Sequence, residues 1–534
     1  MLLKTNTLAA SCLLACSMAA LPALAAENEP PASSAELRFA ISSFDLQGNT
    51  LLPQAEIAAL LAGYTGPSRS FADIRRAVDA LQALYLSRGW STVLVQLPEQ
   101  ELDDQIVKLR VLEPRLRQVR VEGNKHFSES NVRAALVELR EGASLRMNRL
   151  SANVRMANTS PARQVTVGLE ASDDPALLDA VVRVSDQQPW RLALNADNTG
   201  TPSTGRTRLN FVFQHANLGD RDVVASFQYG TTAQEPSKVS VLSGGVRVPL
   251  YALGDSLDLF ATHSNVDAGK VSVGALNLQV SGQGTMLGAR YNRTLAPLGP
   301  LTSTLIGGVD WRAYKNDVSL EGTPIGDEVR VHPLSLGWSG LLPLASSGQL
   351  ALQLTGVRNA PGGAKGSQAD LERQRSGTRG DYRLIRYSTN WNQALGNWLL
   401  RAQWAGQASQ DALIAAEQFG AGGATTVRGF REREISGDQG STAGVELQSP
   451  NLCTGDWATI QCRALGFLDG GSVRRNKALP GEELRSAIAS AGLGVRLALD
   501  RRASLSIDWA RVLDPSARGA AGDHRLHVTL SISP

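Results

Sequence analysis

The feature that most constrains this fold is a strict alternation of apolar and polar side chains from about Trp190 to the end of the chain. In segment 526–532, every second residue is leucine, valine or isoleucine, and the residues between them are histidine, threonine or serine. A period of two predicts β-strands with one apolar and one polar face. About sixteen such segments follow one another. This pattern fits either a soluble β-sandwich or a closed barrel that is apolar towards lipid and polar towards its lumen.

The lengths of the connections distinguish these two folds. Short connections recur at residues 218–220, 253–254, 298–299, 345–347 and 396. Longer polar connections alternate with them, at about residues 279–284, 321–328, 359–380, 414–440, 474–484 and 514–523. Short turns at one end and long loops at the other are typical of a transmembrane barrel, and a soluble sandwich has no need of them. We therefore predict a 16-stranded antiparallel transmembrane β-barrel over residues 190–534, with both ends of this segment on the same side of the membrane.

The first third of the chain contains a repeat. Phe44-Asp-Leu-Gln-Gly-Asn49 precedes an amphipathic segment at 51–61, and Val119-Arg-Val-Glu-Gly-Asn124 precedes a matching segment at 126–136. Each copy predicts a strand, a Gly-Asn turn and a helix. In the second copy, Ser128 stands where an N-cap is expected, and Pro53 favours a helix start in the first.

The first copy continues with a second helix and two strands. We expect the helix at 71–87, with Gly89 as its C-cap, and strands at 91–97 and 105–111. The helix ends in Tyr85-Leu-Ser-Arg-Gly-Trp90. The order of elements is therefore β-α-α-β-β.

The second copy repeats this order, with a helix near 148–156 and strands near 164–170 and 180–184. The order, the turn and the helix end resemble POTRA (polypeptide-transport-associated) domains, although a generic α+β repeat would have the same order. The expected domains are residues 38–113 and 114–189. The resemblance implies periplasmic modules that dock unfolded chains through an exposed strand edge. In the first copy, that edge would carry Val93, Val95 and Leu97.

The N-terminus has the features of a secretory signal peptide. Lys4 precedes an apolar run at 8–24, and Ala23-Leu24-Ala25 is a small-residue cleavage site. We expect a signal peptide at residues 1–25 and a short linker at 26–37. A membrane anchor is disfavoured by the short apolar run, whereas lipoprotein processing at Cys16 stays open.

Removal of the signal peptide takes Cys12 and Cys16 with it and leaves Cys453 and Cys462. An even pair in an exported protein predicts a disulfide. By loop parity the pair lies in a connection at the short-turn end, where it would brace a long turn, and a redox role is the alternative. Two thiolates with no histidine nearby do not predict a zinc site.

The composition argues against several other functions. There are 53 basic and 50 acidic side chains, so the net charge of +3 indicates no nucleic-acid partner. The six histidines have no metal-ligand spacing, and the chain has neither a Gly-x-Ser-x-Gly elbow nor a phosphate loop. We expect no enzyme activity, cofactor, metal or nucleotide.

Two motifs suggest a specific contact inside the barrel. The longest loop, at about 412–440, contains Val427-Arg428-Gly429-Phe430, and a strand further on contains Phe467-Leu468-Asp469-Gly470-Gly471. An arginine on a loop that dips into the lumen can present its planar fork to Asp469, and Gly429 permits a tight turn beside it. A solvated loop arginine and an unrelated lumen acid form the alternative reading.

The chain resembles the two-partner secretion transporters (TpsB type) of the haemolysin secretion/activation family, with two POTRA domains, sixteen strands and both motifs in the same order. The resemblance implies an outer-membrane location, with the POTRA domains in the periplasm. It also implies a loop that folds into the lumen as a lid, anchored by Arg428 and Asp469. The partners would be outer-membrane lipid and a large unfolded exoprotein of TpsA type, secreted through the pore. With no nucleotide site, folding of the exoprotein outside the cell would have to drive transport.

Some features depart from this family. Members often carry a plug helix before the first POTRA domain, and the short linker leads us to expect none. The chain ends in Ile532-Ser533-Pro534 rather than in an aromatic residue. A barrel-assembly factor is the main alternative, since it shares the Arg-Gly loop but usually carries more POTRA domains. A passive porin and a barrel hydrolase are weaker alternatives.

Overall fold

The computed structural model describes residues 37–533, except 102, 267–268, 274–275, 281–282, 316–318, 321–322, 325–327, 455–458, 501 and 518. The expected signal peptide and the region of a plug helix lie outside the described residues. The chain divides into two compact units. One comprises the chain up to Tyr85 together with Leu94–Leu112, and the other comprises Leu86–Val93 and Glu113–Pro534.

The first module, residues 38–113, is a small sheet with two helices. Its elements are β1 (Arg38–Ile41), β2 (Ser43–Gln47), α1 (Gln54–Leu61), η1 (Ala62–Tyr64), β3 (Gly66–Ser70), α2 (Phe71–Ser87), β4 (Leu94–Gln96), η2 (Asp103–Gln105) and β5 (Ile106–Leu112). Strand β5 pairs in parallel with β2 and antiparallel with β4. Helix α2 buries Ile74, Ala77, Leu81 and Tyr85, whose spacing places them on one face. The short sheet β1–β3 was not predicted, because neither segment alternates.

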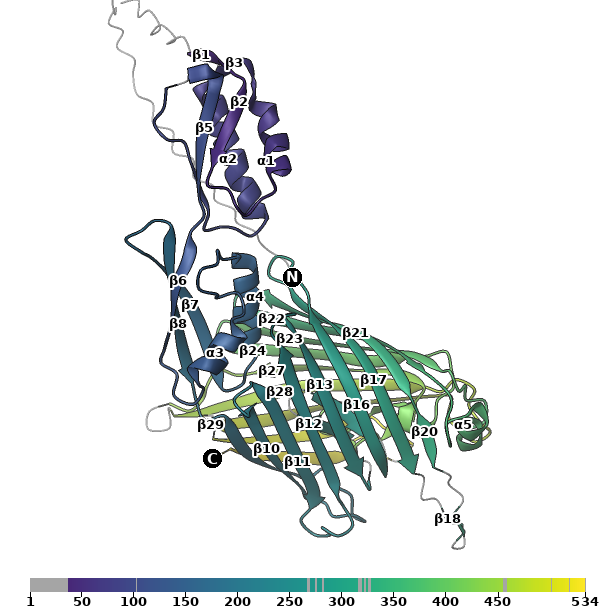
Figure 1. Ribbon diagram of the computed structural model, residues 1–534. Coiled ribbons are helices and arrows are strands. Elements are labelled where there is room, and N and C mark those ends of the chain that lie inside the picture. The colour runs from purple at the N-terminus through teal and green to yellow at the C-terminus, as the bar shows by residue number, and fades with distance from the viewer. Residues whose placement is uncertain are drawn as a thin grey trace, which may run out of the picture. The chain divides into compact units, whose positions relative to one another are not determined.

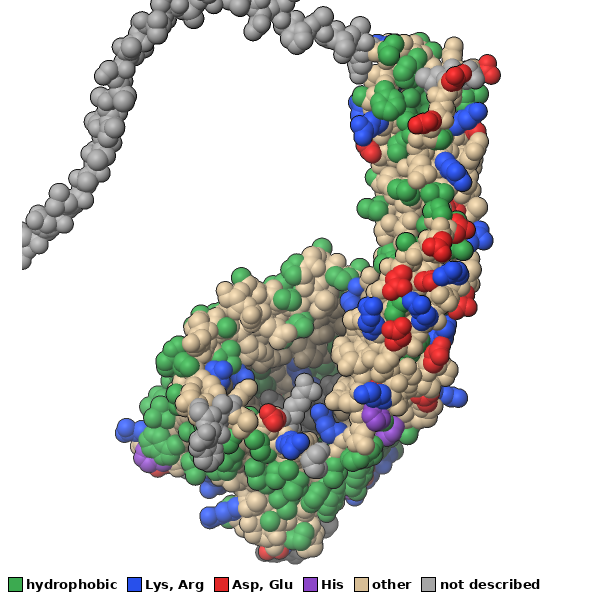
Figure 2. Space-filling model, turned by 90° about the vertical axis from the view of Figure 1, so that its left-hand side faces the viewer, with side chains coloured by type: hydrophobic (Ala, Val, Ile, Leu, Met, Phe, Trp, Pro, Cys, Tyr) green, Lys and Arg blue, Asp and Glu red, His purple; other side chains and the backbone are tan. Residues whose placement is uncertain are grey.

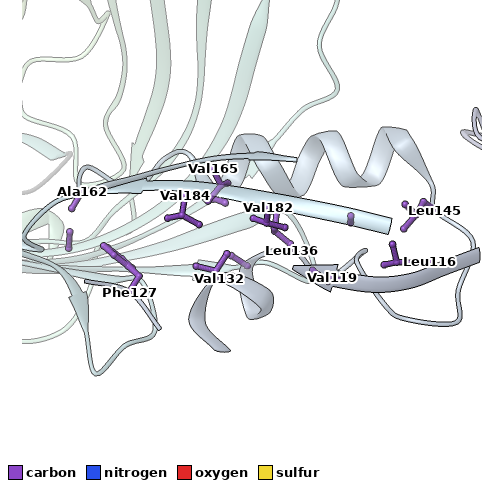
Figure 3. Packing of buried hydrophobic residues seen from close by; sticks show 14 residues of the cluster. Leu116, Val119, Phe127, Val132, Leu136, Leu145, Ala162, Val165, Val182 and Val184 are labelled. Atoms are coloured by element: carbon purple, nitrogen blue, oxygen red, sulfur yellow. The ribbon is translucent and has the colours of Figure 1, made fainter. Parts of the chain in front are cut away.

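The second module, residues 114–189, repeats this arrangement. Its elements are β6 (Arg115–Glu122), α3 (Glu129–Ala135), α4 (Met147–Ala157), β7 (Arg163–Ala171) and β8 (Leu177–Asp186). Strand β8 lies between β6, to which it is parallel, and β7, to which it is antiparallel. The helices pack on this sheet around Phe127, Val132, Leu136 and Val182, as Figure 3 shows. Ser128 caps α3 by accepting a hydrogen bond from the Asn131 amide, as predicted.

The barrel follows the second module and closes on itself (Figure 1). Its strands are β9 (Trp190–Asp197), β10 (Arg208–Leu218), β11 (Val223–Thr232), β12 (Val241–Leu250), β13 (Asp255–Ser264), β16 (Gln283–Thr294), β17 (Thr302–Lys315), β20 (Val329–Val331) with β21 (Pro333–Leu344), β22 (Gly348–Asn359), β23 (Arg383–Leu395), β24 (Trp398–Ala408), β27 (Gln439–Gln448), β28 (Ile460–Arg474), β29 (Arg485–Leu499), β30 (Ala503–Asp514) and β31 (His524–Ile532). Strands β20 and β21 pair with β17 in one register, so they count as a single strand. The barrel is therefore 16-stranded and antiparallel, as predicted, and closes between β31 and β9.

The alternation in the sequence separates the outside of the barrel from its lumen. Leu468 is 58% exposed on the outer surface, whereas its neighbour Asp469 is 1% exposed and faces inwards. Figure 2 shows hydrophobic side chains over the outer surface and charged side chains within the hollow. The connections sort into a short-turn end, which also carries the start of β9, and a long-loop end.

Most of the long connections lie where the sequence predicts them. The prediction of a connection at 279–284 is wrong, because a hairpin of β14 (Gly269–Val273) and β15 (Leu276–Val280) precedes β16, which already begins at Gln283. Residues 321–328 lie largely outside the described residues, next to β18 (Ser319–Leu320) and β19 (Thr323–Pro324). The connection after β22 holds a short helix, α5 (Gln368–Gln374), whose capping box at Ser367 and Asp370 we did not anticipate. Among the described residues, no helix is long and apolar enough to cross a membrane.

Candidate functional site

The longest loop, between β24 and β27, folds inwards and packs against the barrel wall. It contains η3 (Ala415–Glu417) and a small hairpin of β25 (Phe419–Ala421) and β26 (Ile435–Gly437). We call residues 409–438 the lid loop. Its buried Val427 and Phe430 share an apolar cluster with wall residues Val473, Ile488 and Val512. Apolar side chains are unusual on a polar lumen wall, so this patch is matched to the loop that covers it.

At the tip of the lid loop, Arg428 lies in a socket of acidic side chains. Its Nε and Nη2 donate to the two carboxylate oxygens of Asp469 at 2.7 and 3.0 Å, which is a bidentate pair. The Arg428 backbone N–H also donates to Asp469, at 3.1 Å. The remaining guanidinium nitrogen, Nη1, lies 2.8 Å from Glu446 and 3.4 Å from Asp508. We call Asp469, Glu446 and Asp508 the acidic socket.

Two further features keep the Arg428 side chain charged and oriented. Its guanidinium lies over the ring of Phe467, with 3.4 Å between Cζ and the ring centroid, a cation–π contact. Burial acts to lower the Arg428 pKa, but the hydrogen-bonded Asp469 carboxylate outweighs it and raises the pKa above its ordinary value. The arginine is therefore permanently cationic, and its position depends on the acids around it.

Two glycines in the motifs help the lid loop to fit the wall, Gly429 through its backbone conformation and Gly471 through close packing. Gly429 has a φ of +97°, and its N–H donates to His527 Nε2 at 2.9 Å. A Cβ at Gly471 would lie 3.0–3.1 Å from side chains of Ala421, Thr442 and Val427. The absence of a side chain at Gly471 thus makes room for the lid loop on the wall.

The motifs located Arg428 and Asp469 but missed the rest of the socket. Glu446 and Asp508 come from β27 and β30, and Arg496 of β29 bridges them at 3.3 and 2.9 Å. All three belong to the inward phase of their strands. Alternation could have marked them as lumen residues, but the stagger that brings them to one height is set by strand register.

Beside the lid loop lies a cavity of about 550 Å³. Its lining includes Gln418 and Arg433 of the lid loop and wall residues such as Arg247 and Arg290. The lid loop therefore forms part of the boundary of the remaining open space in the lumen.

The edge strand expected to dock partners is only partly accessible. Val93 and Val95 are buried and Leu97 is half-buried, so the exposed side chains on β4 are Leu94 and Gln96. The Val95 N–H, which points away from β5, donates to Oε1 of Gln82 at 2.9 Å. A helix side chain thus already occupies this backbone donor on the edge.

A second candidate is β7, which is an edge strand of the second module and is longer than β4. Asn158 caps it at Val165, donating to the carbonyl oxygen and accepting from the N–H at 3.0 and 2.7 Å. Val165 pairs with Val184 of β8, so Val167 and Leu169 share its outward backbone orientation.

Cys453 and Cys462 form a disulfide, with 5.3 Å between their Cα atoms. It closes the connection between β27 and β28 at the short-turn end. Among the described residues, no cluster of three or more histidine, cysteine, aspartate or glutamate side chains could hold a metal ion.

Comparisons with known proteins agree with this architecture. A family model described as haemolysin secretion/activation protein ShlB/FhaC/HecB matches residues 179–497, and a ShlB-type POTRA model matches residues 39–114. The outer membrane transporter CdiB of Dickeya dadantii (strain 3937) is 24% identical over 470 residues, 82% of this chain and 77% of the relative. The hemolysin transporter protein HpmB of Proteus mirabilis is 25% identical over 426 residues, 76% of this chain and 71% of the relative.

Among solved structures, CdiB from Escherichia coli has a TM-score of 0.72 at 21% identity and covers 95% of this chain and 92% of its own. CdiB from Acinetobacter baumannii has a TM-score of 0.67 at 15% identity and covers 93% and 90%. At these identities the likeness shows a shared fold.

Proposed function

Because the chain belongs to the ShlB/FhaC/HecB family of haemolysin secretion/activation proteins, we propose that it captures an unfolded exoprotein with its POTRA domains and secretes it through its barrel. The protein lies in the outer membrane, with its POTRA domains in the periplasm. Relatives are named outer membrane or hemolysin transporters. The single observation that best supports transport is the lid loop, a segment of the chain that occupies the lumen and is held there by Arg428 in the acidic socket.

Capture is by strand addition to an exposed edge. An incoming chain bonds with backbone groups, so the edge accepts many sequences. The edge strand carrying Val93, Val95 and Leu97 is one candidate, and the backbone of β7 around Leu169 offers a longer one. The cargo is a large exoprotein of TpsA type, met as an unfolded chain.

Passage requires the lid loop to leave its resting contacts. Ion pairs and a modest apolar cluster hold it, and polar and charged contacts exchange readily with those of a passing chain in a wet lumen. Removing one partner of a buried ion pair typically costs about 3–5 kcal/mol, because the other charge is left buried without a partner, so the loss of Arg428 or Asp469 should shift the resting position of the lid loop. Folding of the exoprotein outside the cell supplies the direction of transport.

The function is tested by comparing the secreted and outer-membrane proteomes of cells with and without this protein. We expect one large exoprotein to disappear from the medium while other outer-membrane barrels keep their levels. A general fall in those barrels would instead establish a barrel-assembly factor and overturn the proposal.

The lid contact is tested by Arg428→Ala and Asp469→Ala. Both should reduce secretion several-fold while the barrel still inserts and migrates as a folded species on unheated gels. Arg358→Ala is the control, because its exposed side chain pairs with Asp381 rather than with a residue of the lid loop. Normal secretion in both lid variants would remove Arg428 from the mechanism.

A further inference from the structure

The first part of the lid loop, residues 409–417, carries a second buried charge that lies outside the acidic socket. We call this part the first leg. The Glu417 side chain is fully buried, and both of its oxygens have partners. Oε1 accepts from Arg312 Nη1 at 2.8 Å and from the Tyr314 hydroxyl at 2.9 Å. Oε2 accepts from Arg386 Nη2 at 3.2 Å. We call Arg312, Tyr314 and Arg386 the basic socket.

The two sockets lie on different arcs of the wall and have opposite charge. The basic socket belongs to β17 and β23, and the acidic socket to β27, β28 and β30. In the ring, five strands stand between β17 and β28, whereas β24 alone stands between β23 and β27. Only ten residues separate Glu417 from Arg428 in the sequence. The lid loop is therefore held at two places on the lumen wall, by an acid at one and a base at the other.

The surroundings of Glu417 make the first leg more firmly held than a single ion pair would. Leu413 and Ile414, just before it, are buried in an apolar cluster with Tyr382, Leu371 and Leu384. This cluster joins the leg to the long-loop end of the barrel.

Asp438, at the far end of the lid loop, fixes the base of the same leg. Its buried carboxylate accepts from the Leu413 N–H at 2.9 Å and from Gln418 Nε2 at 3.1 Å. It also pairs with Arg375 at 2.5 Å and accepts from the Asn476 N–H at 2.6 Å. Both legs of the lid loop are thus joined to each other and to two neighbouring loops.

We propose that Glu417 is a second positioning residue of the lid loop, which fixes its first leg to the β17–β23 wall independently of Arg428. Release of Arg428 then swings the tip about this leg and opens the lumen only in part. Full opening requires the basic socket to release Glu417 as well. This inference rests on the proposed role of the loop as a lid, but it concerns where the loop is held rather than what is transported.

The experiment is a measurement of ion current through the purified full-length protein in planar bilayers. It compares the wild type with Glu417→Gln, Arg428→Ala, the double variant and a protein whose residues 415–435 are replaced by a short linker. We expect intermediate currents in the two single variants. The double variant should reach the current of the shortened protein.

Two controls keep the test decisive. Glu328→Gln makes the same charge change at a glutamate whose ion pairs are with Arg330 and Lys365 rather than with the basic socket, so its current should equal that of the wild type. If Glu417→Gln fails to fold, Arg386→Gln removes one partially exposed donor of the socket and tests the same contact. Glu417→Asp, which keeps the charge, should restore part of the closure.

Wild-type current in both Glu417→Gln and Arg386→Gln would overturn the inference, as would full opening by Arg428→Ala alone. Secretion is measured on the same variants in cells. If the currents change as expected while secretion stays normal, the two contacts of the lid loop are supported. The same result counts against the proposal that the exoprotein passes through the lumen when the lid loop moves. Loss of secretion with Arg428→Ala, together with unchanged current in Glu417→Gln, would overturn the second anchor and leave the proposed function standing.

Discussion

The two POTRA domains have the same turn after the first strand but differ in what surrounds them. Gly48 and Gly123 have φ of +89° and +85°, and the side-chain amides of Asn49 and Asn124 each donate at 2.9 Å to the carbonyl three residues on. A Cβ at either glycine would lie within 2.5 Å of a carbonyl oxygen, so no other residue fits. The repeat in the sequence therefore encodes a repeated local geometry.

The difference lies in the contacts of the second domain with the barrel. Arg163, at the start of β7, is fully buried and pairs at 2.8 Å with Asp222 in the turn after β10. Asp222 also accepts from the Tyr251 hydroxyl, and Arg163 also donates to Asn131. Within its unit, the second domain is thus attached to the barrel by a buried polar network. The second domain therefore has a long edge strand, β7, that is fixed at its start by Arg163. The first domain has a short edge strand, β4, whose Val95 N–H is already bonded to Gln82.

Breaking the buried pair is the most severe test of this comparison. Arg163→Ala leaves Asp222 buried with too few donors, which should destabilise the junction by about 3–5 kcal/mol. We expect faster hydrogen exchange in residues 127–132 and 216–222 and a large loss of secretion. Asp222→Asn should act in the same direction, because it removes the negative charge that pairs with Arg163. Asparagine tolerates the positive φ of 56° at this position, so the effect would not come from backbone strain.

The control for this pair is Arg117→Ala in the same domain. Arg117 pairs with Asp179, but its side chain is 48% exposed, so the loss of this pair should leave secretion close to normal. Equal effects of Arg163→Ala and Arg117→Ala would mean that the junction has no special role.

The second prediction concerns the edge of β7. Leu169→Pro removes an outward-facing N–H without removing a hydrogen bond to β8, so the domain should fold while strand addition is weakened. We expect capture of a urea-unfolded cargo segment by the full-length protein to fall several-fold, measured by biolayer interferometry. Leu169→Ala keeps the N–H and serves as the matched control. Unchanged capture by the proline variant would exclude β7 as the docking edge.

Much of this architecture could be predicted from the sequence, because the relevant signals are local. Alternation, loop parity and the Gly-Asn turns specify the barrel and the repeat, and helix α2 lies at the predicted residues. The contacts that hold the parts together could not be predicted in the same way. Glu417 and Arg163 look like ordinary charged residues in the sequence, and their partners lie 105 and 59 positions away.

Strand register is the second reason for what was missed. Asp469 of β28 is the register partner of Gly444 of β27 rather than of Glu446, and in this register both acids bond to Arg428. The interior face of a strand follows from a period of two, but its height against a neighbour depends on turns and bulges that the pattern does not encode.

The third prediction tests whether β4 of the first domain is an occupied edge. Gln82→Ala removes the acceptor of the Val95 N–H, which should destabilise the first domain by about 1 kcal/mol while keeping α2 helical. Capture should stay unchanged if β7 is the docking edge. An increase in capture would show that β4 also docks cargo once its donor is free, and the contrast between the two edges would then be one of regulation.

The smallest expected effect concerns acid stability of the second domain. The hydrogen bond from Arg117, and then that from Gln118, lowers the pKa of Asp179 to about 2 from its ordinary value of 3.8. Because the folded-state pKa is the lower one, the contribution of Asp179 to stability is complete above about pH 4 and is lost as the pH falls towards 2. Brief digestion with pepsin between pH 4 and 2 should therefore cut residues 115–186 increasingly in the wild type. In Asp179→Asn this pH dependence should be weaker, with cleavage already raised at pH 4, while cleavage within residues 38–85 should be the same in both proteins. An equal pH dependence in the variant would mean that the Asp179 pair does not distinguish the second domain from the first.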